Sequence, residues 1–235
     1  PASVGALFRD RVSASATKVA FQYATVGADG TDTWHDVTWG QANDVIYALA
    51  AALVELGIQP EERVAIASGT RYEWALADLA VMCAGGATTT IYPTTIPDDV
   101  AFILADSASR VVFAEDETQL AKLVGIRDLV PGVMAVILMS GSVPSDAPAG
   151  WVHTLADLQA RGTAYLEEHP GAVDERIEAS RPDQLATLIY TSGTTGRPKG
   201  VRLLHSTWTY QGAAVAAINI LTEDDLQYLW LPLSH

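Results

Sequence analysis

The sequence predicts an α/β protein whose parallel strands form lobes with helices on both faces of the sheet. Short apolar segments of strand length alternate with amphipathic segments of helix length after residue 57. Such alternation is typical of parallel strand–helix–strand units. Hydrophobic residues make up 49% of the chain and charged residues 18%, which excludes a disordered protein. The 235 residues are enough to bury a core in one large domain or in about two small ones.

Before the alternating region, the pattern predicts a helix, two strands and a long helix. Residues 4–14 have a helical pattern, and residues 19–25 and 33–37 have strand patterns joined by the turn residues Ala28-Asp29-Gly30. Apolar side chains then recur at spacings of three and four residues up to Gly57, which predicts an amphipathic helix that ends there. The recurring residues are Val45, Ile46, Leu49, Ala52, Leu53 and Leu56.

The alternating region itself predicts strands and helices in regular succession. The predicted strands are 64–67, 88–91, 111–114 and 133–139, and the predicted helices are 72–83, 98–104, 117–123 and 154–161. Pro97 falls in the first turn of one helix, where a proline has no hydrogen bond to lose. Thr154 and Asp157 have the spacing of a capping pair at the start of the last helix. A Gly/Pro/Ser-rich loop is expected over residues 140–150.

The later part of the chain predicts a division into two lobes. Polar residues 163–184 predict a connector, so residues 1–180 would form the first lobe and residues 181–235 the start of a second. In the second part we expect a strand at 185–190, a helix at 206–218 and a strand at 227–231. Because the chain begins at Pro1 and stops just after an apolar run, we expect a fragment of a longer protein with an incomplete large domain.

Charge and cysteine content limit the partners and the compartment. There are 14 Lys and Arg residues against 28 Asp and Glu residues, a net charge of −14, so the general field repels nucleic acid and anionic membranes. Cys83 is the single cysteine, which agrees with the reducing cytoplasm that we expect as the location. No apolar run reaches the length of a membrane span. Peripheral membrane contact and self-association are left open.

The most informative stretch is a loop rich in glycine and threonine after a predicted buried strand. It is Thr191-Ser192-Gly193-Thr194-Thr195-Gly196-Arg197-Pro198-Lys199-Gly200. Its glycines let backbone amides turn toward an anion, its hydroxyls add donors, and Lys199 adds a mobile positive charge. These properties predict a phosphate site; the alternative is a plain surface turn. The loop is not a Walker A motif, because Lys199 is followed by Gly200 rather than by Ser or Thr.

Residues 190–201 resemble the phosphate-binding signature of the adenylate-forming superfamily, which includes acyl-CoA synthetases, luciferases and peptide-synthetase adenylation domains. The pattern Tyr/Phe-Thr-Ser-Gly-Ser/Thr-Thr-Gly-x-Pro-Lys-Gly-Val is matched at every position. Residues 34–39 and 71–74 resemble bacterial long-chain fatty acyl-CoA synthetases, and residues 231–235 resemble the next motif of the superfamily. The resemblance covers nearly the whole chain. It implies the N-terminal part of the acyl-adenylate-forming fold.

The resemblance also implies a two-step reaction and roles for individual residues. A carboxylate attacks the α-phosphate of ATP, giving an acyl-adenylate and pyrophosphate, and the thiol of CoA then displaces AMP; Mg²⁺ assists the first step. Lys199 would be catalytic by stabilising the leaving pyrophosphate, and Thr191 would contact Mg²⁺. The residues implied to bind the ATP phosphates are Thr191, Ser192, Gly193, Thr194, Thr195, Gly196 and Lys199. His235 would lie at the acyl or adenylate pocket, or would simply end a strand.

Other residues have a functional and a structural interpretation. The superfamily often continues with Thr-His-x-Asn, and here only His205 of that motif is matched, so His205 is interpreted as structural. Trp208 is the tryptophan that best fits a pocket, whereas Trp39 and Trp74 are expected in the core. The acidic run 223–225 is interpreted as a solvated turn rather than a metal site. Cys83 lies on an apolar helix and is interpreted as core rather than as a thioester nucleophile.

We therefore expect the N-terminal part of an ATP-dependent, AMP-forming long-chain fatty acid–CoA ligase, with small-molecule substrates. The alternatives are an enzyme that adenylates an aryl or other carboxylic acid, and a nucleotide- or acyl-binding module without catalysis. The 235-residue chain alone is expected not to complete adenylation, because the later motifs of the superfamily are absent from it.

Overall fold

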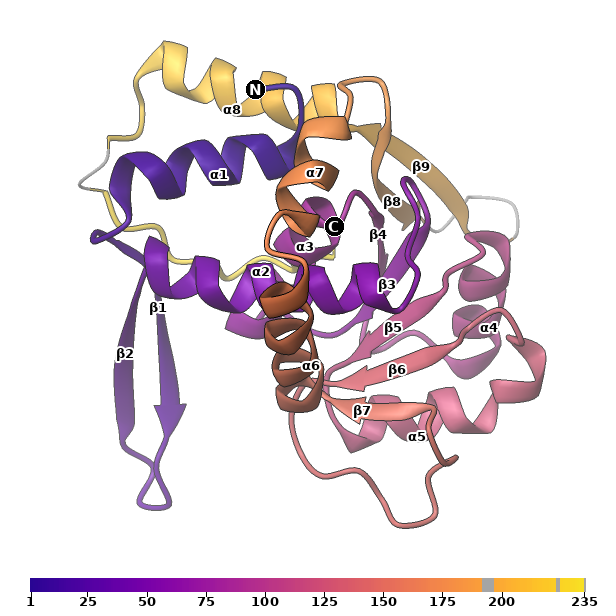
Figure 1. Cartoon of the computed structure of the whole chain (residues 1–235). Helices are drawn as coiled ribbons and strands as arrows, with labels where there is room; N and C mark the ends of the chain where they lie inside the picture. The colour runs from indigo at the N-terminus through magenta and orange to yellow at the C-terminus, as the bar shows by residue number, and fades with distance from the viewer. Residues whose placement is uncertain (192–196, 223–224, 235) are drawn as a thin grey trace.

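The computed structural model describes residues 1–191, 197–222 and 225–234 and is built around one twisted sheet (Figure 1). The strand order is β7-β6-β5-β3-β4-β8-β9. Neighbouring strands are parallel except β8 and β9, which form an antiparallel pair at one edge. The strands are β3 (Arg63–Ala67), β4 (Ala87–Ile91), β5 (Val111–Ala114), β6 (Ala135–Leu138), β7 (Val152–Thr154), β8 (Leu185–Thr191) and β9 (Lys199–Leu204). The predicted parallel α/β class is confirmed.

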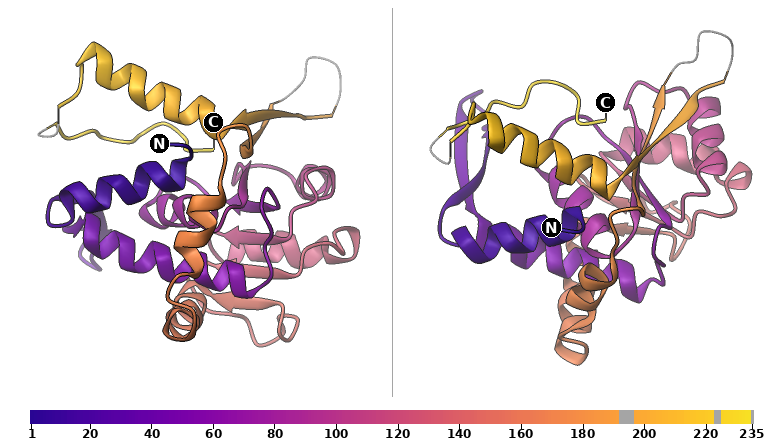
Figure 2. Two further views of the ribbon diagram at one scale, coloured as in Figure 1. Left: turned by 45° about the horizontal axis from the view of Figure 1, so that its top comes forward. Right: turned by 90° about the horizontal axis from the view of Figure 1, so that it is seen from above.

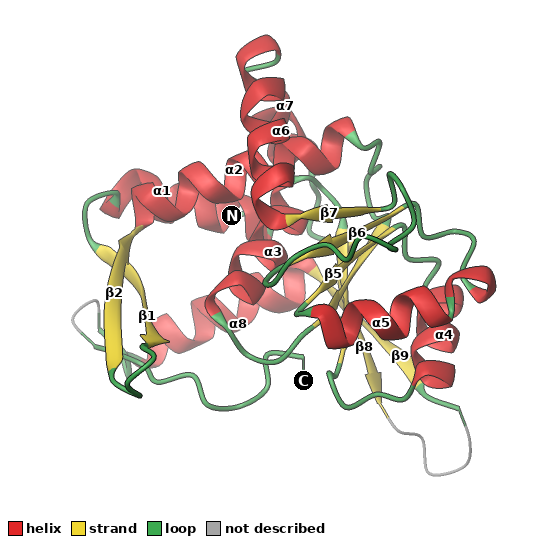
Figure 3. Cartoon of the chain, turned by 90° about the horizontal axis from the view of Figure 1, so that it is seen from below, coloured by secondary structure: helices red, strands yellow, loops and turns green. Residues whose placement is uncertain are grey.

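Helices cover both faces of the sheet, as Figure 3 shows with α4 and α5 on one side and α2 and α3 on the other. The first layer contains α1 (Val4–Ser15), α2 (Trp39–Glu55), α3 (Tyr72–Cys83), α6 (Leu155–Glu168) and α7 (Ala172–Ala179). The second layer contains α4 (Pro97–Asp106), α5 (Glu117–Gly125) and the short 3₁₀ helix η1 (Arg127–Leu129). Helix α8 (His205–Ile218) follows β9 and runs alongside α1 (Figure 2).

Side chains that alternate along the strands separate two hydrophobic cores. Val64 and Ile66 of β3 face the core under α2 and α3, whereas Ala65 and Ala67 face the core under α4 and α5. This is the pattern of parallel strands that are buried on both faces. The sheet is therefore a rigid base from which the loops at its carboxyl edge project.

The long helix α2 begins at a capping box that the sequence supplies. The Thr38 hydroxyl accepts from the Gln41 amide at 3.2 Å, and the Gln41 side chain accepts from the Thr38 amide at 2.8 Å. Each bond satisfies a backbone donor at the helix start. The predicted capping pair of α6, Thr154 and Asp157, is also present.

Strands β1 (Val19–Val26) and β2 (Asp32–Thr38) form a separate antiparallel hairpin that extends away from the sheet (Figure 1). The predicted turn is present, and Gly30 adopts φ +81°, a region that favours glycine. At the base of the hairpin, the ring of Tyr23 stacks on that of Tyr72 with 4.7 Å between centroids. This contact ties the hairpin to the start of α3.

Two of the predictions for the later part of the chain are wrong. The polar connector at 163–184 contains the end of α6 and all of α7, whose Val173 and Ile177 are buried in the core. The predicted strand at 227–231 is an irregular segment with exposed side chains, because no described strand lies beside it to pair with its backbone. Strands β7 and β9 were not predicted.

The predicted boundary at residue 180 stays a prediction. Across it, β8 pairs in parallel with β4, so the described residues on both sides contribute to the same sheet. In the described part of the chain, no helix combines the length and the apolar character that crossing a bilayer requires.

Candidate phosphate site and adjoining pocket

The loop that the sequence singled out closes a β-hairpin at the edge of the sheet. Thr191, the last residue of β8, pairs with Lys199, the first residue of β9, and both are exposed. The pairing therefore brings together the two ends of the predicted phosphate loop. Ser192, Gly193, Thr194, Thr195 and Gly196, which are predicted to bind phosphate, lie outside the described residues, as does His235.

The base of this hairpin is fixed by Tyr190. A Cβ on Gly200 would lie 3.2 Å from the Tyr190 ring, so only glycine lets the two strands approach without the ring giving way. The Tyr190 hydroxyl donates to the Asp106 carboxylate at the end of α4 at 2.7 Å. Burial, and then this hydrogen bond, raise the pKa of Tyr190 above its ordinary value. Tyr190 thus anchors the ends of the loop to α4.

The three cations near the loop do not form one cluster. The Arg197 guanidinium lies over the Phe102 ring, 5.1 Å from its centroid, a cation–π contact. Lys199 and Arg202 lie three residues apart in β9, so their side chains leave opposite faces of the strand. Lys199 is therefore the cation that β9 presents at the end of the loop.

A cavity of about 500 Å³ borders both ends of the loop at the carboxyl edge of β4 and β8. Hydroxyl side chains dominate its lining: Thr90, Tyr92, Thr94, Thr95, Tyr190 and Thr191. Asp99 contributes a carboxylate, and Ile96, Ile103 and Pro198 complete the wall. Ligand sites in α/β sheets commonly form at such carboxyl ends of parallel strands. We call this space the hydroxyl cavity.

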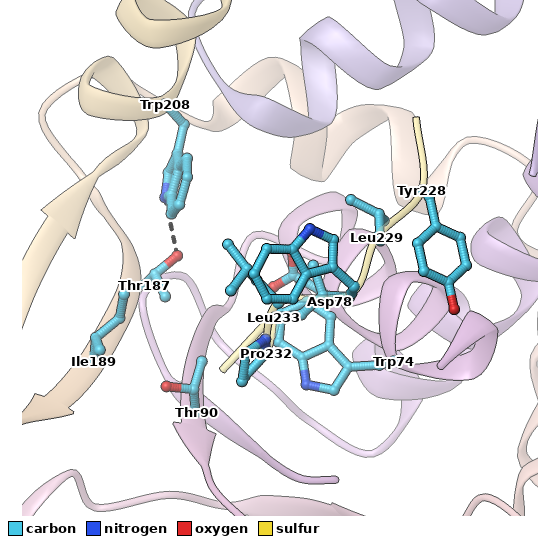
Figure 4. A pocket seen from close by; sticks show the side chains of 12 residues that line it. Trp74, Asp78, Thr90, Thr187, Ile189, Trp208, Tyr228, Leu229, Pro232 and Leu233 are labelled. Atoms are coloured by element: carbon cyan, nitrogen blue, oxygen red, sulfur yellow. Dashed lines mark hydrogen bonds between the residues drawn. The ribbon is translucent and has the colours of Figure 1, made fainter. Parts of the chain in front are cut away.

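A second space of about 390 Å³, the apolar pocket, opens on the α3 side (Figure 4). Trp74 of α3 and Trp208 of α8 line it together with the segment 228–233. The Trp208 indole donates to the Thr187 hydroxyl at 3.0 Å. Trp74 is buried, and its indole N–H has no partner among the described residues. Trp208 thus lines a pocket, as its functional interpretation predicts. Trp74, which was predicted in the core, lines the same pocket.

Asp78 is the carboxylate of the apolar pocket, and the sequence analysis missed it. The Thr88 hydroxyl donates to Asp78 at 2.6 Å, and burial raises the pKa of Asp78 to about 6. Thr90 was also missed. It lines both the apolar pocket and the hydroxyl cavity, and its hydroxyl donates to the Ser234 carbonyl at 2.9 Å. Thr90 is therefore a lining residue that the two spaces share.

His205 has the contacts of a structural residue. It is 1% exposed, its Nδ1 accepts from the Val4 amide at 3.3 Å, and its own amide donates to the Gln184 carbonyl. Burial lowers the pKa of the imidazole below its ordinary value, which favours the neutral form. His205 lines neither cavity and joins the starts of α1 and α8.

The other residues with two interpretations show structural contacts. Cys83 is buried in the core, and burial raises the pKa of its thiol. Asp225 accepts from the amide and the hydroxyl of Thr222, as in a turn, while Glu223 and Asp224 lie outside the described residues. Across the described ranges, no three His, Cys, Asp or Glu side chains gather closely enough to hold a metal ion.

A mostly parallel sheet with helices on both faces places the chain in the α/β class. More narrowly, the chain belongs to the family of AMP-binding enzymes, whose model matches residues 8–235. The resemblance to the adenylate-forming superfamily is confirmed.

Individual relatives agree with this assignment. The chain is 36% identical over 204 residues to the long-chain-fatty-acid–CoA ligase FadD15 of Mycobacterium bovis, covering 86% of this chain and 32% of that protein. It is 28% identical over 239 residues to the long-chain-fatty-acid–CoA ligase ACSBG2 of Xenopus laevis, of which it covers 31%. The chain thus spans about a third of the length of these relatives.

The anthranilate CoA ligase AuaEII, solved with anthranoyl-AMP, shares the fold. Its TM-score to this chain is 0.72 at 22% identity, over 93% of this chain and 38% of that chain. This comparison establishes the fold alone.

Proposed function

We propose that this chain is the N-terminal part of an ATP-dependent, AMP-forming long-chain fatty acid–CoA ligase. The reaction converts a fatty acid, ATP and CoA into acyl-CoA, AMP and pyrophosphate through an acyl-adenylate. The observation that carries the proposal is that Thr90 lines both the apolar pocket and the hydroxyl cavity. A fatty acid needs an apolar space for its chain, next to a polar space where its carboxylate reaches a phosphate.

The apolar pocket is suited to the acyl chain. Its wall is formed mainly by tryptophan, leucine and isoleucine side chains, and each buried methylene contributes roughly 0.8 kcal/mol to binding. Trp74 and Trp208 come from different helices, so the acyl chain of the fatty acid would lie between α3 and α8. The carboxylate would then point toward Thr90.

The hydroxyl cavity and the loop are suited to the triphosphate. Two anions, the carboxylate and ATP, must approach each other, and donors placed around the leaving pyrophosphate lower that barrier. Lys199 supplies a positive charge at the end of the loop, and Thr191 supplies a hydroxyl on the strand opposite. We propose that the amides and hydroxyls of residues 192–196 contribute as well.

The residues around Thr191 fit Mg²⁺, because the polar side chains that line the hydroxyl cavity are hydroxyls and one carboxylate and Mg²⁺ prefers oxygen ligands with phosphates and water. Thr191 would contact the ion. When bound, the ion would offset charge on the phosphates. We place the reaction in the cytoplasm, where ATP and CoA are available.

An aryl acid is the second candidate substrate. The indole rings of Trp74, Trp208 and Trp230, which line the apolar pocket, would stack against an aromatic acid as well as against an alkyl chain.

The test is carboxylate-dependent exchange between ATP and pyrophosphate by the intact protein that contains this chain. Acids from acetate to stearate are compared with benzoate, in the wild type and in Lys199→Ala. Arg202→Ala, which removes an exposed cation from the opposite face of β9, is the matched control.

We expect exchange to peak with long acids, to fall by about 10²-fold or more in Lys199→Ala, and to stay near wild type in Arg202→Ala. A peak with benzoate would support the aryl candidate. No exchange with any acid would refute adenylation and leave a binding module. The 235-residue chain alone is expected to show little or no acyl-CoA formation, and substantial formation would contradict that expectation.

A further inference from the structure

The turn over residues 92–96 forms part of the wall of the hydroxyl cavity. Tyr92, Thr94, Thr95 and Ile96 line this cavity together with Thr191 and Pro198 at the ends of the phosphate loop. The turn leaves the carboxyl end of β4 and leads into α4. Within the turn, the Thr95 amide donates to the Tyr92 carbonyl at 3.0 Å, and contacts from α5 hold further peptide groups.

Two side chains of α5 hold this turn from outside the cavity. The Lys122 ammonium donates to the Pro93 carbonyl at 2.5 Å and to the Thr95 carbonyl at 3.2 Å. The side-chain amide of Gln119 also donates to the Pro93 carbonyl, at 3.1 Å. Gln119 is buried. Hydrogen bonds from an ammonium group are about twice as strong as those between neutral groups, so Lys122 is the main contact.

These bonds determine where the neighbouring amide groups point. In a trans peptide the carbonyl and the following N–H lie on opposite sides of the chain, and the described residues have no cis peptide bond. Because the Pro93 and Thr95 carbonyls point toward α5, the N–H groups of Thr94 and Ile96 point away from it. Within the described ranges, neither of these two amides donates to a backbone carbonyl.

We infer that the turn over residues 92–96 is a second wall of the phosphate site, and that Lys122 is the positioning residue that orients it. The inference rests on the proposed function. The Thr94 and Ile96 amides and the Thr94 and Thr95 hydroxyls would face the polyphosphate opposite Thr191 and Lys199. Lys122 would not touch the ligand; its charge would orient the donors that do. Because the Asp99 carboxylate lines the same space, the expected ligand is a magnesium-complexed polyphosphate rather than the bare anion.

The test uses variants of the intact protein and magnesium pyrophosphate as the probe. Lys122→Met keeps the length of the stem and removes the donors, whereas Lys122→Arg keeps a cation that reaches both carbonyls. Ala121→Met places the same new side chain on the neighbouring exposed position of α5 and is the matched control. Gln119→Leu removes the weaker contact and keeps the inference testable should Lys122→Met fail to fold.

Calorimetry gives the Kd of magnesium pyrophosphate for each variant, and exchange kinetics give KM for ATP and kcat. We expect Lys122→Met to weaken pyrophosphate binding about tenfold, with a matching rise in KM, little change in kcat and a melting temperature near wild type. Lys122→Arg should restore most of the affinity, Gln119→Leu should lose about threefold, and Ala121→Met should resemble the wild type.

Each outcome decides the inference separately from the proposed function. Wild-type affinity in Lys122→Met, an equal loss in Ala121→Met, or a wild type that does not bind the probe would overturn it. A loss confined to Lys122→Met and Gln119→Leu in a protein that shows no carboxylate-dependent exchange would support the second wall while refuting the ligase.

Discussion

Gly162 of α6 packs directly against the backbone of Ala48 in α2. A Cβ built on Gly162 would lie 1.7 Å from the Ala48 carbonyl oxygen, far inside any van der Waals contact. The two helices therefore approach each other at a distance that only glycine permits, and this contact sets the position of α6 on the body of the molecule.

We expect Gly162→Ala to destabilise the protein by about 3 kcal/mol or more, because the helices must separate and the core beneath them must repack. Urea unfolding measures the change. Gly125→Ala, at the end of α5 where a Cβ meets no atom within 4 Å, is the control and should be neutral or slightly stabilising. Equal effects of the two substitutions would contradict the close contact.

Asp78 makes stability depend on pH. Its pKa is raised to about 6 by burial, from an ordinary value of 3.8, so the folded state binds the proton more tightly than the unfolded state. This contribution to stability is complete below pH 3.8 and is lost as the pH rises toward 6.

Asp78→Asn removes this dependence and keeps an acceptor for the Thr88 hydroxyl. The difference in unfolding free energy between variant and wild type should grow in favour of the variant by up to about 1.4 kcal/mol per pH unit in that window, and then level off. Urea unfolding at several pH values measures it. A difference that does not change with pH would show that Asp78 titrates normally.

The capping box of α2 predicts a measurable loss in Thr38→Ala. The substitution removes the acceptor for the Gln41 amide and should lower stability by about 1 kcal/mol. Thr163→Ala, inside α6 on an exposed side, is the control and should have little effect. Thermal unfolding of both variants separates the cap from the general effect of losing a threonine.

Trp208 tests whether the apolar pocket holds the acyl chain. Removing its ring in Trp208→Ala should raise the KM for a long fatty acid about tenfold, since a large apolar contact is lost, and should leave the KM for acetate nearly unchanged. Trp34→Ala, on the β1–β2 hairpin where the side chain is 60% exposed, is the matched control. An equal change in KM for long and short acids would show that the acyl chain binds outside the apolar pocket.

The core of the fold could be predicted because its signals are local. The limits of α3 agree with the predicted 72–83, and β5 agrees with 111–114. In both, the apolar residues recur with a regular period, and in α3 the pair Gly85-Gly86 marks the end of the helix. Helix α7 was missed because its two core residues, Val173 and Ile177, lie among charged residues and give only one turn of periodicity.

The remaining differences depend on contacts between distant parts of the chain. Strand β9 contains Gly200 and follows Pro198, which argue for a loop, and only the pairing with β8 makes it a strand. Residues 227–231 have the composition of a strand but lack a neighbouring strand in the described chain. The positions of Asp78 and Thr90 at the two cavities likewise follow from packing, since neither residue carries a motif of its own.

The pairing of Thr191 with Lys199 separates two kinds of sequence change. Residues added between these two would only enlarge a closed loop, because the strands that clamp it keep their partners. A single residue added within β9 would instead invert every side chain beyond it relative to the sheet. The fold thus tolerates variation in the length of the loop but not in the length of β9. The number of residues from Lys199 to His205 is therefore more constrained than the number in the loop.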